Sequence, residues 1–205
     1  MIAVHFTSTG FVAKINHITS VAKNPRAVLL AGGRKAGNLI KKNFRQKDRT
    51  EPNKLGGTRQ HFWRAMAASV SAPVMESPLS VSVAITDPRF RQKLLGGVIT
   101  AKRAKALTIP VQKEAYGRSA SVFEKETGLK LFLLKVNAHA FLAARLGDSV
   151  QIEYLLTPSV KQNPDPTALP DQHELETGVI ETMQATLDRQ LAGPGAAATP
   201  GENPA

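Results

Sequence analysis

The pattern that most restricts the fold of this chain lies in residues 25–45. Asn24 is a favourable N-cap, and Pro25 suits the first position of a helix. At 100° per residue, the apolar side chains fall on one side of this helix and the basic side chains on the other. The apolar set is Val28, Leu29, Ala36, Leu39, Ile40 and Phe44, and the basic set is Arg34, Lys35, Lys41, Lys42 and Arg45. The segment predicts an amphipathic helix with a basic outer face.

A glycine pair, Gly32 and Gly33, lies on the apolar side of this helix. Each glycine lowers helix propensity by about 1 kcal/mol relative to alanine. The pair has two interpretations, which the residues alone do not separate. It allows another part of the chain to approach the helix backbone closely, or it marks a local weakness or kink.

The remaining pattern predicts short strands and two further helices. We expect strands at Ile2–Phe6, 79–86, 98–100, 106–110, 131–136 and 150–156, of which 79–86 has the strictest alternation. We expect a short helix at 11–18, a helix after Thr58 that carries Phe62 and Val70, and a last helix at 171–192. Residues 141–146 fit a strand or a short helix, 45–58 a basic loop, Asp87-Pro88 a turn and 111–128 an extended loop.

These elements predict an α+β fold, in which N-terminal amphipathic helices pack on a small, mostly antiparallel sheet and a C-terminal helix follows. The expected organisation is one domain over residues 1–157, a proline-rich linker at 158–170, the helix at 171–192 and a disordered tail at 193–205.

The net charge of +11 is concentrated in the first part of the chain. Residues 1–118 hold 21 Lys and Arg against 5 Asp and Glu, whereas residues 119–205 hold 6 against 11. A basic field of this kind attracts polyanions or acidic protein surfaces. No apolar run approaches the roughly 20 residues of a bilayer span, and the N-terminus lacks the pattern of a secretory signal. We therefore expect no membrane contact.

The motifs of common enzymes are missing from the sequence. There is no cysteine, which excludes disulfides and thiolate chemistry, and the five histidines lack metal-ligand spacing. The segments at Gly32-Gly33-Arg34-Lys35 and Gly56-Gly57-Thr58-Arg59 lack the spacing of a phosphate-binding loop. We expect no catalytic residue, no cofactor and no metal site.

Two basic segments are the candidates for binding, residues 41–64 and residues 89–105. Phosphate contacts would give them sequence-independent, salt-sensitive affinity for nucleic acid. Phe44, Phe62, Trp63 and Phe90 are interleaved with the charges, as base stacking requires. However, Phe44 and Phe62 lie on apolar helix faces and favour the core. Solvated charge and an acidic protein partner are the other interpretations of these segments.

The order of these parts resembles the phage virion morphogenesis (tail completion) family typified by phage Mu. It resembles, more loosely, the head–tail joining proteins of lambda-like phages such as HK97. The likeness runs through the strand at Ile2–Phe6, the helix at Pro25–Arg45, the glycine-rich loop with a tryptophan at Lys54–Trp63, and a strand ending at Asp87. It continues through Arg91–Gly97, a lysine-rich stretch closing on Ala106–Pro110, and a helix after a proline-rich turn. Relative to shorter members, residues 111–149 are an insertion.

The resemblance implies a structural protein of the virion, assembled in the host cytoplasm. Its members close the tail or join it to the head as tail terminator or neck proteins. The implied partners are copies of the chain in a homo-oligomeric ring, for which a hexamer is expected, and the tail-tube and head-connector proteins. A basic lining would ease the passage of DNA. The expected contact surface comprises Arg89, Arg91, Lys93, Gly96, Gly97, Lys102, Arg103 and Lys105. The alternative function is sequence-independent binding of nucleic acid by the basic half.

Overall fold

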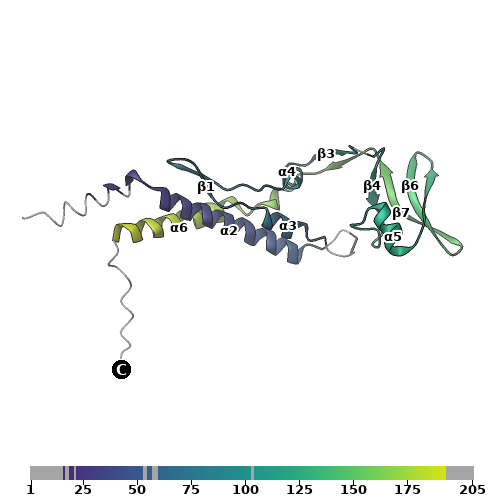
Figure 1. Cartoon of the computed structure of the whole chain (residues 1–205), viewed down its shortest axis with the longest axis horizontal. Coiled ribbons are helices and arrows are strands. Elements are labelled where there is room, and N and C mark those ends of the chain that lie inside the picture. The colour runs from purple at the N-terminus through teal and green to yellow at the C-terminus, as the bar shows by residue number, and fades with distance from the viewer. Residues whose placement is uncertain are drawn as a thin grey trace, which may run out of the picture. The chain divides into compact units, whose positions relative to one another are not determined.

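The computed structural model describes residues 16, 19–20, 22–52, 55–56, 60–102 and 104–192 (Figure 1). Within them the fold is α+β, as predicted, with a long helix in the N-terminal part, antiparallel sheets and a C-terminal helix. The chain divides into two compact units, and this division differs from the single domain expected over residues 1–157. The helical unit takes its described residues from Met1–Asn43, Ser69–Thr86 and Pro170–Ala205, and the sheet unit comprises Phe44–Ala68 and Asp87–Leu169. The expected strand at Ile2–Phe6, nearly all of the helix at 11–18, Thr58 and the tail at 193–205 lie outside the described residues.

Helix α2 (Arg26–Thr50) confirms the amphipathic helix and extends it past the predicted end. Residues 46–50, expected to begin a basic loop, are helical. Their i,i+4 interactions explain the extension, because the hydroxyl of Thr50 donates to the carbonyl of Gln46 and Lys47 pairs with Glu51 at 2.8 Å. The loop therefore starts at Glu51.

The glycine pair of α2 lies where other segments approach the helix closely. A Cβ on Gly32 would lie 2.8 Å from Met183 in α6 (Gln172–Ala192), and one on Gly33 would lie 2.7 Å from Pro73. Figure 1 shows α6 running beside α2. Of the two interpretations of the pair, close approach is confirmed.

Helix α6 confirms the last predicted helix. Asp171 caps it, because its carboxylate accepts from the backbone N–H of His173 at 2.9 Å and of Glu174 at 3.2 Å.

The strand predicted at 79–86 is present only in part. Ser80–Ser82 (β2) pairs with Val74–Ser77 (β1), and the pairing then moves to a different partner. Ser71 and Thr86 donate backbone hydrogen bonds to Ala84 and Ser69, next to an isolated bridge between Val70 and Ile85. The alternation is real, but each of the two partner segments is short, so that no continuous strand forms.

The sheet unit contains a helix that was not predicted from the sequence. Pro88–Leu95 is α4, so the expected turn at Asp87-Pro88 is wrong. Asp87 is the N-cap, accepting from the backbone N–H of Arg89 at 2.9 Å, and Pro88 takes the first helical position. The expected linker at 158–170 is also wrong, because Ser159–Gln162 (β8) pairs with Gly97–Thr100 (β3) and Pro166–Ala168 is a 3₁₀ turn.

An aromatic cluster forms one hydrophobic core of the sheet unit. Phe44 is fully buried, and Trp63, in α3 (Phe62–Ala68), and Phe90 are nearly so. The ring of Phe44 stacks on that of Trp63 with centroids 5.5 Å apart and meets that of Phe90 at 5.3 Å. The predicted preference of Phe44 for the core is confirmed.

A four-stranded antiparallel sheet completes the sheet unit, in the order β4-β7-β6-β5. Its strands are Leu107–Pro110 (β4), Leu131–Val136 (β5), His139–Leu146 (β6) and Ser149–Thr157 (β7). They confirm three predicted strands and show that 141–146 is strand. Ala120–Thr127 is helix α5, which the expected loop at 111–128 did not include. Ser119 caps its start, and Gly128, with φ of 71°, ends it.

Candidate assembly surfaces

The predicted contact surface is spread over α4, β3 and the segment after it. Arg89, Arg91 and Lys93 lie on α4, Gly96 ends it, Gly97 begins β3, and Lys102 and Lys105 are exposed beyond β3. Arg103 lies outside the described residues. Arg89 is held locally, because its guanidinium lies 2.6 Å from the carboxylate of Asp87. The hydrogen bonds from Arg89 hold the pKa of Asp87 below its usual value.

Lys93 has a structural role in the sheet unit. Its Nζ pairs with Asp165 Oδ2 at 3.0 Å and lies 5.6 Å from the ring centroid of Trp63. Burial acts to raise the pKa of Asp165, but hydrogen bonds from Thr167 and Lys93 outweigh it and lower that pKa overall. The charge of Lys93 is thus used within its own chain.

Lys47 and Glu51 also contact Trp63. Lys47 Nζ lies 5.1 Å from the ring centroid, and the indole N–H of Trp63 donates to Glu51 Oε2 at 2.6 Å. Lys47 also donates to the hydroxyl of Thr167 at 3.0 Å. Part of the predicted basic segment 41–64 therefore stabilises the fold.

Gly96 also serves packing. Its φ of 67° and ψ of −158° form a conformation that glycine alone adopts readily. A Cβ there would lie 2.6 Å from the carbonyl oxygen of Gln162 and from the nitrogen of Pro164. The turn from α4 into β3 thus needs glycine.

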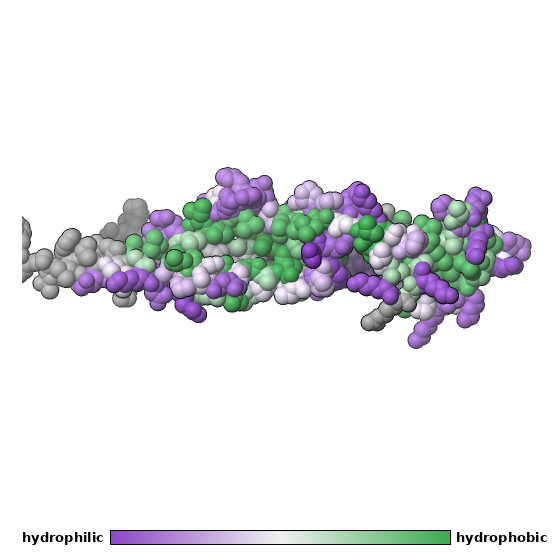
Figure 2. Space-filling model, turned by 90° about the horizontal axis from the view of Figure 1, so that it is seen from above, coloured by the Kyte–Doolittle hydropathy of each residue, from purple (hydrophilic) through white to green (hydrophobic). Residues whose placement is uncertain are grey.

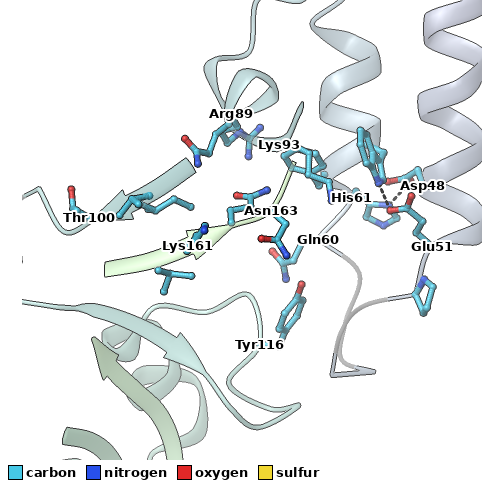
Figure 3. Close-up of a pocket in the computed structure, with 18 of the residues that line it drawn as sticks. Asp48, Glu51, Gln60, His61, Arg89, Lys93, Thr100, Tyr116, Lys161 and Asn163 are labelled. Carbon is cyan, nitrogen blue, oxygen red and sulfur yellow. Dashed lines mark hydrogen bonds and ion pairs between the residues drawn. The ribbon is translucent and has the colours of Figure 1, made fainter. Parts of the chain in front are cut away.

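A cavity of about 1070 Å³ adjoins this surface within the sheet unit. Its basic lining residues are Arg89, Lys93, Lys102 and Lys161. Its acidic lining residues, Asp48 and Glu51, are engaged, since Asp48 lies 2.9 Å from the ring of His61 and Glu51 accepts from Trp63 (Figure 3). Lys102 and Lys161 form no ion pair with any described residue. The cavity is therefore suited to an anionic group.

Helix α5 covers one face of the four-stranded sheet within the sheet unit. Tyr154 and Phe123 are buried between the sheet and α5, and the Tyr154 hydroxyl donates to the carbonyl of Arg118 at 3.2 Å. Side chains alternate between faces along each strand, so the strand register assigns a set of apolar residues to the face opposite Tyr154. This set, called here the open sheet face, comprises Leu107, Ile109, Phe132, Leu134, Val136, Phe141, Ile152 and Leu155.

The open sheet face is apolar and partly accessible. None of its eight large side chains is fully buried, and Val136 is 45% exposed. Within the sheet unit, helix α5 packs on the opposite face, through Phe123 against Tyr154 (Figure 1). Arg145 lies on the same face, 6.0 Å from the ring of Phe132. Apolar patches of this kind commonly mark protein interaction sites.

Apolar side chains also reach solvent on other elements. Leu79 after β1, Leu95 on α4, Val98 on β3 and Ile180 on α6 are each at least 60% exposed. Figure 2 shows broad hydrophobic areas between charged residues on the face seen there.

Glu153 is the one buried carboxylate among the described residues. It lies at a bulge in β7, where the register with β6 shifts between Ile152 and Tyr154, so that two successive residues are both buried. Its Oε2 has no hydrogen-bond partner. Burial, and then the nearby charge of Glu114, raise the pKa of Glu153.

Two further findings concern metal binding and membrane crossing, and both apply to the described part of the chain. There, no three His, Asp or Glu side chains are grouped so that they could hold a metal ion. No described helix combines the length and apolarity that crossing a bilayer requires. No protein-family model matches the chain, and no curated protein and no solved structure is significantly similar to it.

Sequence reasoning missed two parts of these surfaces. The apolar residues of 131–136 and 150–156 were visible in the sequence. Which of them share the open sheet face depends on the register of four strands, β4 to β7, and so could not be predicted from local pattern. The partners of Lys93 and Trp63 come from distant segments and left no local pattern.

Proposed function

We propose that this chain is a structural virion protein of a tailed phage, which forms a homo-oligomeric ring at the tail–neck region. There it would act in tail completion, as a tail terminator or as a head–tail joining protein. The layout of the sequence supports the phage assignment. The open sheet face carries the proposal of assembly, because a partly exposed apolar sheet face gains stability when another protein surface buries it.

In this proposal the open sheet face is buried against a neighbouring subunit. Rings arise from heterologous contacts in which one surface of each subunit meets a different surface of the next. The exposed apolar residues on β3 and α4 supply further contact area for the tail-tube or head-connector proteins.

A pair of lysine substitutions on one strand tests the role of the open sheet face. Leu134 lies on this face, and its neighbour Leu133 points to the opposite face of β5 and is 56% exposed. We expect Leu134→Lys to convert rings into smaller species in size-exclusion chromatography with light scattering. Leu133→Lys should leave the rings intact.

Val136→Lys is the second variant, because Val136 is exposed on the same face and its replacement does not disturb the core. Circular dichroism of each variant checks the fold. Rings that persist in folded Leu134→Lys and Val136→Lys would contradict the proposed role of this face.

The basic cavity favours a second candidate function, binding of nucleic acid without sequence preference. Lys102 and Lys161 line the cavity without a described acidic partner. Under this alternative, DNA affinity in a gel-shift assay falls steeply between about 50 and about 200 mM salt. It also falls in Lys102→Glu and Lys161→Glu, whereas the oligomeric state does not change. Under the ring proposal, discrete oligomers form without DNA and persist at moderate salt.

A further inference from the structure

Helix α6 and residues 26–43 of helix α2, which both belong to the helical unit, present opposite charges on different surfaces. The two helices pack closely, with Gly32 beside Val179 and Met183 and with Gly178 beside Leu39 and the side chain of Lys35. At 100° per residue, the side of α6 turned away from α2 carries Glu174, Glu181 and Asp188, all exposed.

The outer side of α2 carries the opposite sign. Arg34 is exposed there, and Lys41 lies two turns further along with a half-buried side chain. This side faces away from the contacts that the helix makes through Gly32 and Gly33.

None of these charges is paired among the described residues. Neither Glu174, Glu181 and Asp188 of α6 nor Arg34 and Lys41 of α2 form an ion pair there.

The spacing of the two sets also agrees. Glu174, Glu181 and Asp188 recur every seven residues, and Arg34 and Lys41 are seven residues apart. With a rise of 1.5 Å per residue, both spacings are about 10.5 Å along the helix axis. An α2 surface laid along an α6 surface can therefore place charges of opposite sign opposite each other.

We infer that the basic side of α2 in one subunit docks on the acidic side of α6 in the next copy of the chain. The inference rests on the proposed homo-oligomeric ring and names the contact that fixes the order of its subunits. Because the two surfaces differ and are complementary, the contact can repeat head-to-tail from copy to copy until the ring closes.

Charge reversal provides the test. In the full-length chain, Glu181→Lys with Asp188→Lys makes both surfaces basic, and Arg34→Glu with Lys41→Glu makes both acidic. We expect each double variant alone to associate at least about a hundredfold more weakly than the wild type, because like charges then meet. Light scattering after size-exclusion chromatography measures this loss. A matched control, Lys125→Glu with Lys130→Glu on α5 and before β5, should assemble as the wild type does.

Mixing the two double variants gives the decisive result. In an equimolar mixture every α2–α6 contact between unlike variants again joins opposite charges, so rings of alternating subunits should reappear. Native mass spectrometry with one variant isotope-labelled identifies the alternation. Should a charge-reversed variant misfold, Glu181→Gln with Asp188→Asn removes the two negative charges and keeps the helix. This neutral variant should still assemble more weakly than the wild type. The variant with Glu181→Lys and Asp188→Lys should not restore its assembly.

The outcomes separate this inference from the proposed function. A wild type that stays monomeric at every concentration overturns both. A wild type that forms rings, together with folded reversed variants that form the same rings, overturns only the α2–α6 contact.

Discussion

At the scale of single residues, the charges near the aromatic core differ in role although their sequence context is similar. Lys93 is paired with Asp165 over Trp63, whereas Lys102 and Lys161 face the cavity without a described acidic partner. The count of basic residues predicted the charged segment, but it could not distinguish these roles. The distinction depends on Asp165, which lies far along the chain in a segment expected to be a linker.

Asp165→Asn should destabilise the fold in a pH-dependent way. The folded pKa of Asp165 is lowered, so its stabilising effect is complete above the unfolded value of about 3.9 and is lost as the pH falls through the folded pKa. We expect a loss of about 1 kcal/mol in the free energy of unfolding at pH 7. Urea unfolding at pH 7 and below pH 4 measures it. A difference from the wild type that is equally large at both pH values would exclude the ionic role.

Glu153→Gln should stabilise the fold at high pH. The folded pKa of Glu153 is raised, so its charge destabilises the fold once the pH exceeds the unfolded value of about 4.3, most strongly above the folded pKa. We expect the variant to be about 1 kcal/mol more stable than the wild type at pH 8 and little changed at pH 4. Thermal unfolding at the two pH values tests this, and a variant that is less stable at pH 8 would refute it.

At the scale of elements, the local sequence pattern predicted the segments that are long and regularly periodic. Helices α2 and α6 and strands β5 and β7 carry long, regular periodicity, and they were predicted to within a few residues. The short helices α4 and α5 were missed, although Asp87-Pro88 and Ser119 are good caps, because eight residues hold little periodicity. Strand β8 depends on pairing with β3, which no local pattern in 158–170 indicates.

Three glycines of α2 provide a matched test of close packing. Gly33→Ala would place a Cβ 2.7 Å from the rigid ring of Pro73, whereas at Gly37 the nearest atom would be at an ordinary 3.6 Å. We expect Gly33→Ala to lose about 1–3 kcal/mol of unfolding free energy. Gly37→Ala should gain up to about 1 kcal/mol through helix propensity. Gly32→Ala should fall between them, because the Met183 side chain is flexible. Denaturant unfolding of the three variants gives the order, and a stabilised Gly33→Ala would contradict the packing.

At the scale of the whole molecule, two surfaces suit the proposed contacts between copies of the chain. In the proposed ring, the open sheet face would supply apolar area, and the opposite charges of α2 and α6 would set the order of the subunits. The sequence predicted the basic side of α2 and the acidic residues of α6 as separate features. Only the packing of the two helices shows that these charges lie away from the contact between α2 and α6. They are left without partners among the described residues.

The most direct test of this account is the native mass of the purified full-length chain at physiological salt, without DNA. We expect a discrete closed oligomer, with six copies of the 22.0 kDa chain as the expected ring. A single 22.0 kDa species at every concentration measured would contradict the claim that the chain works by assembling with copies of itself.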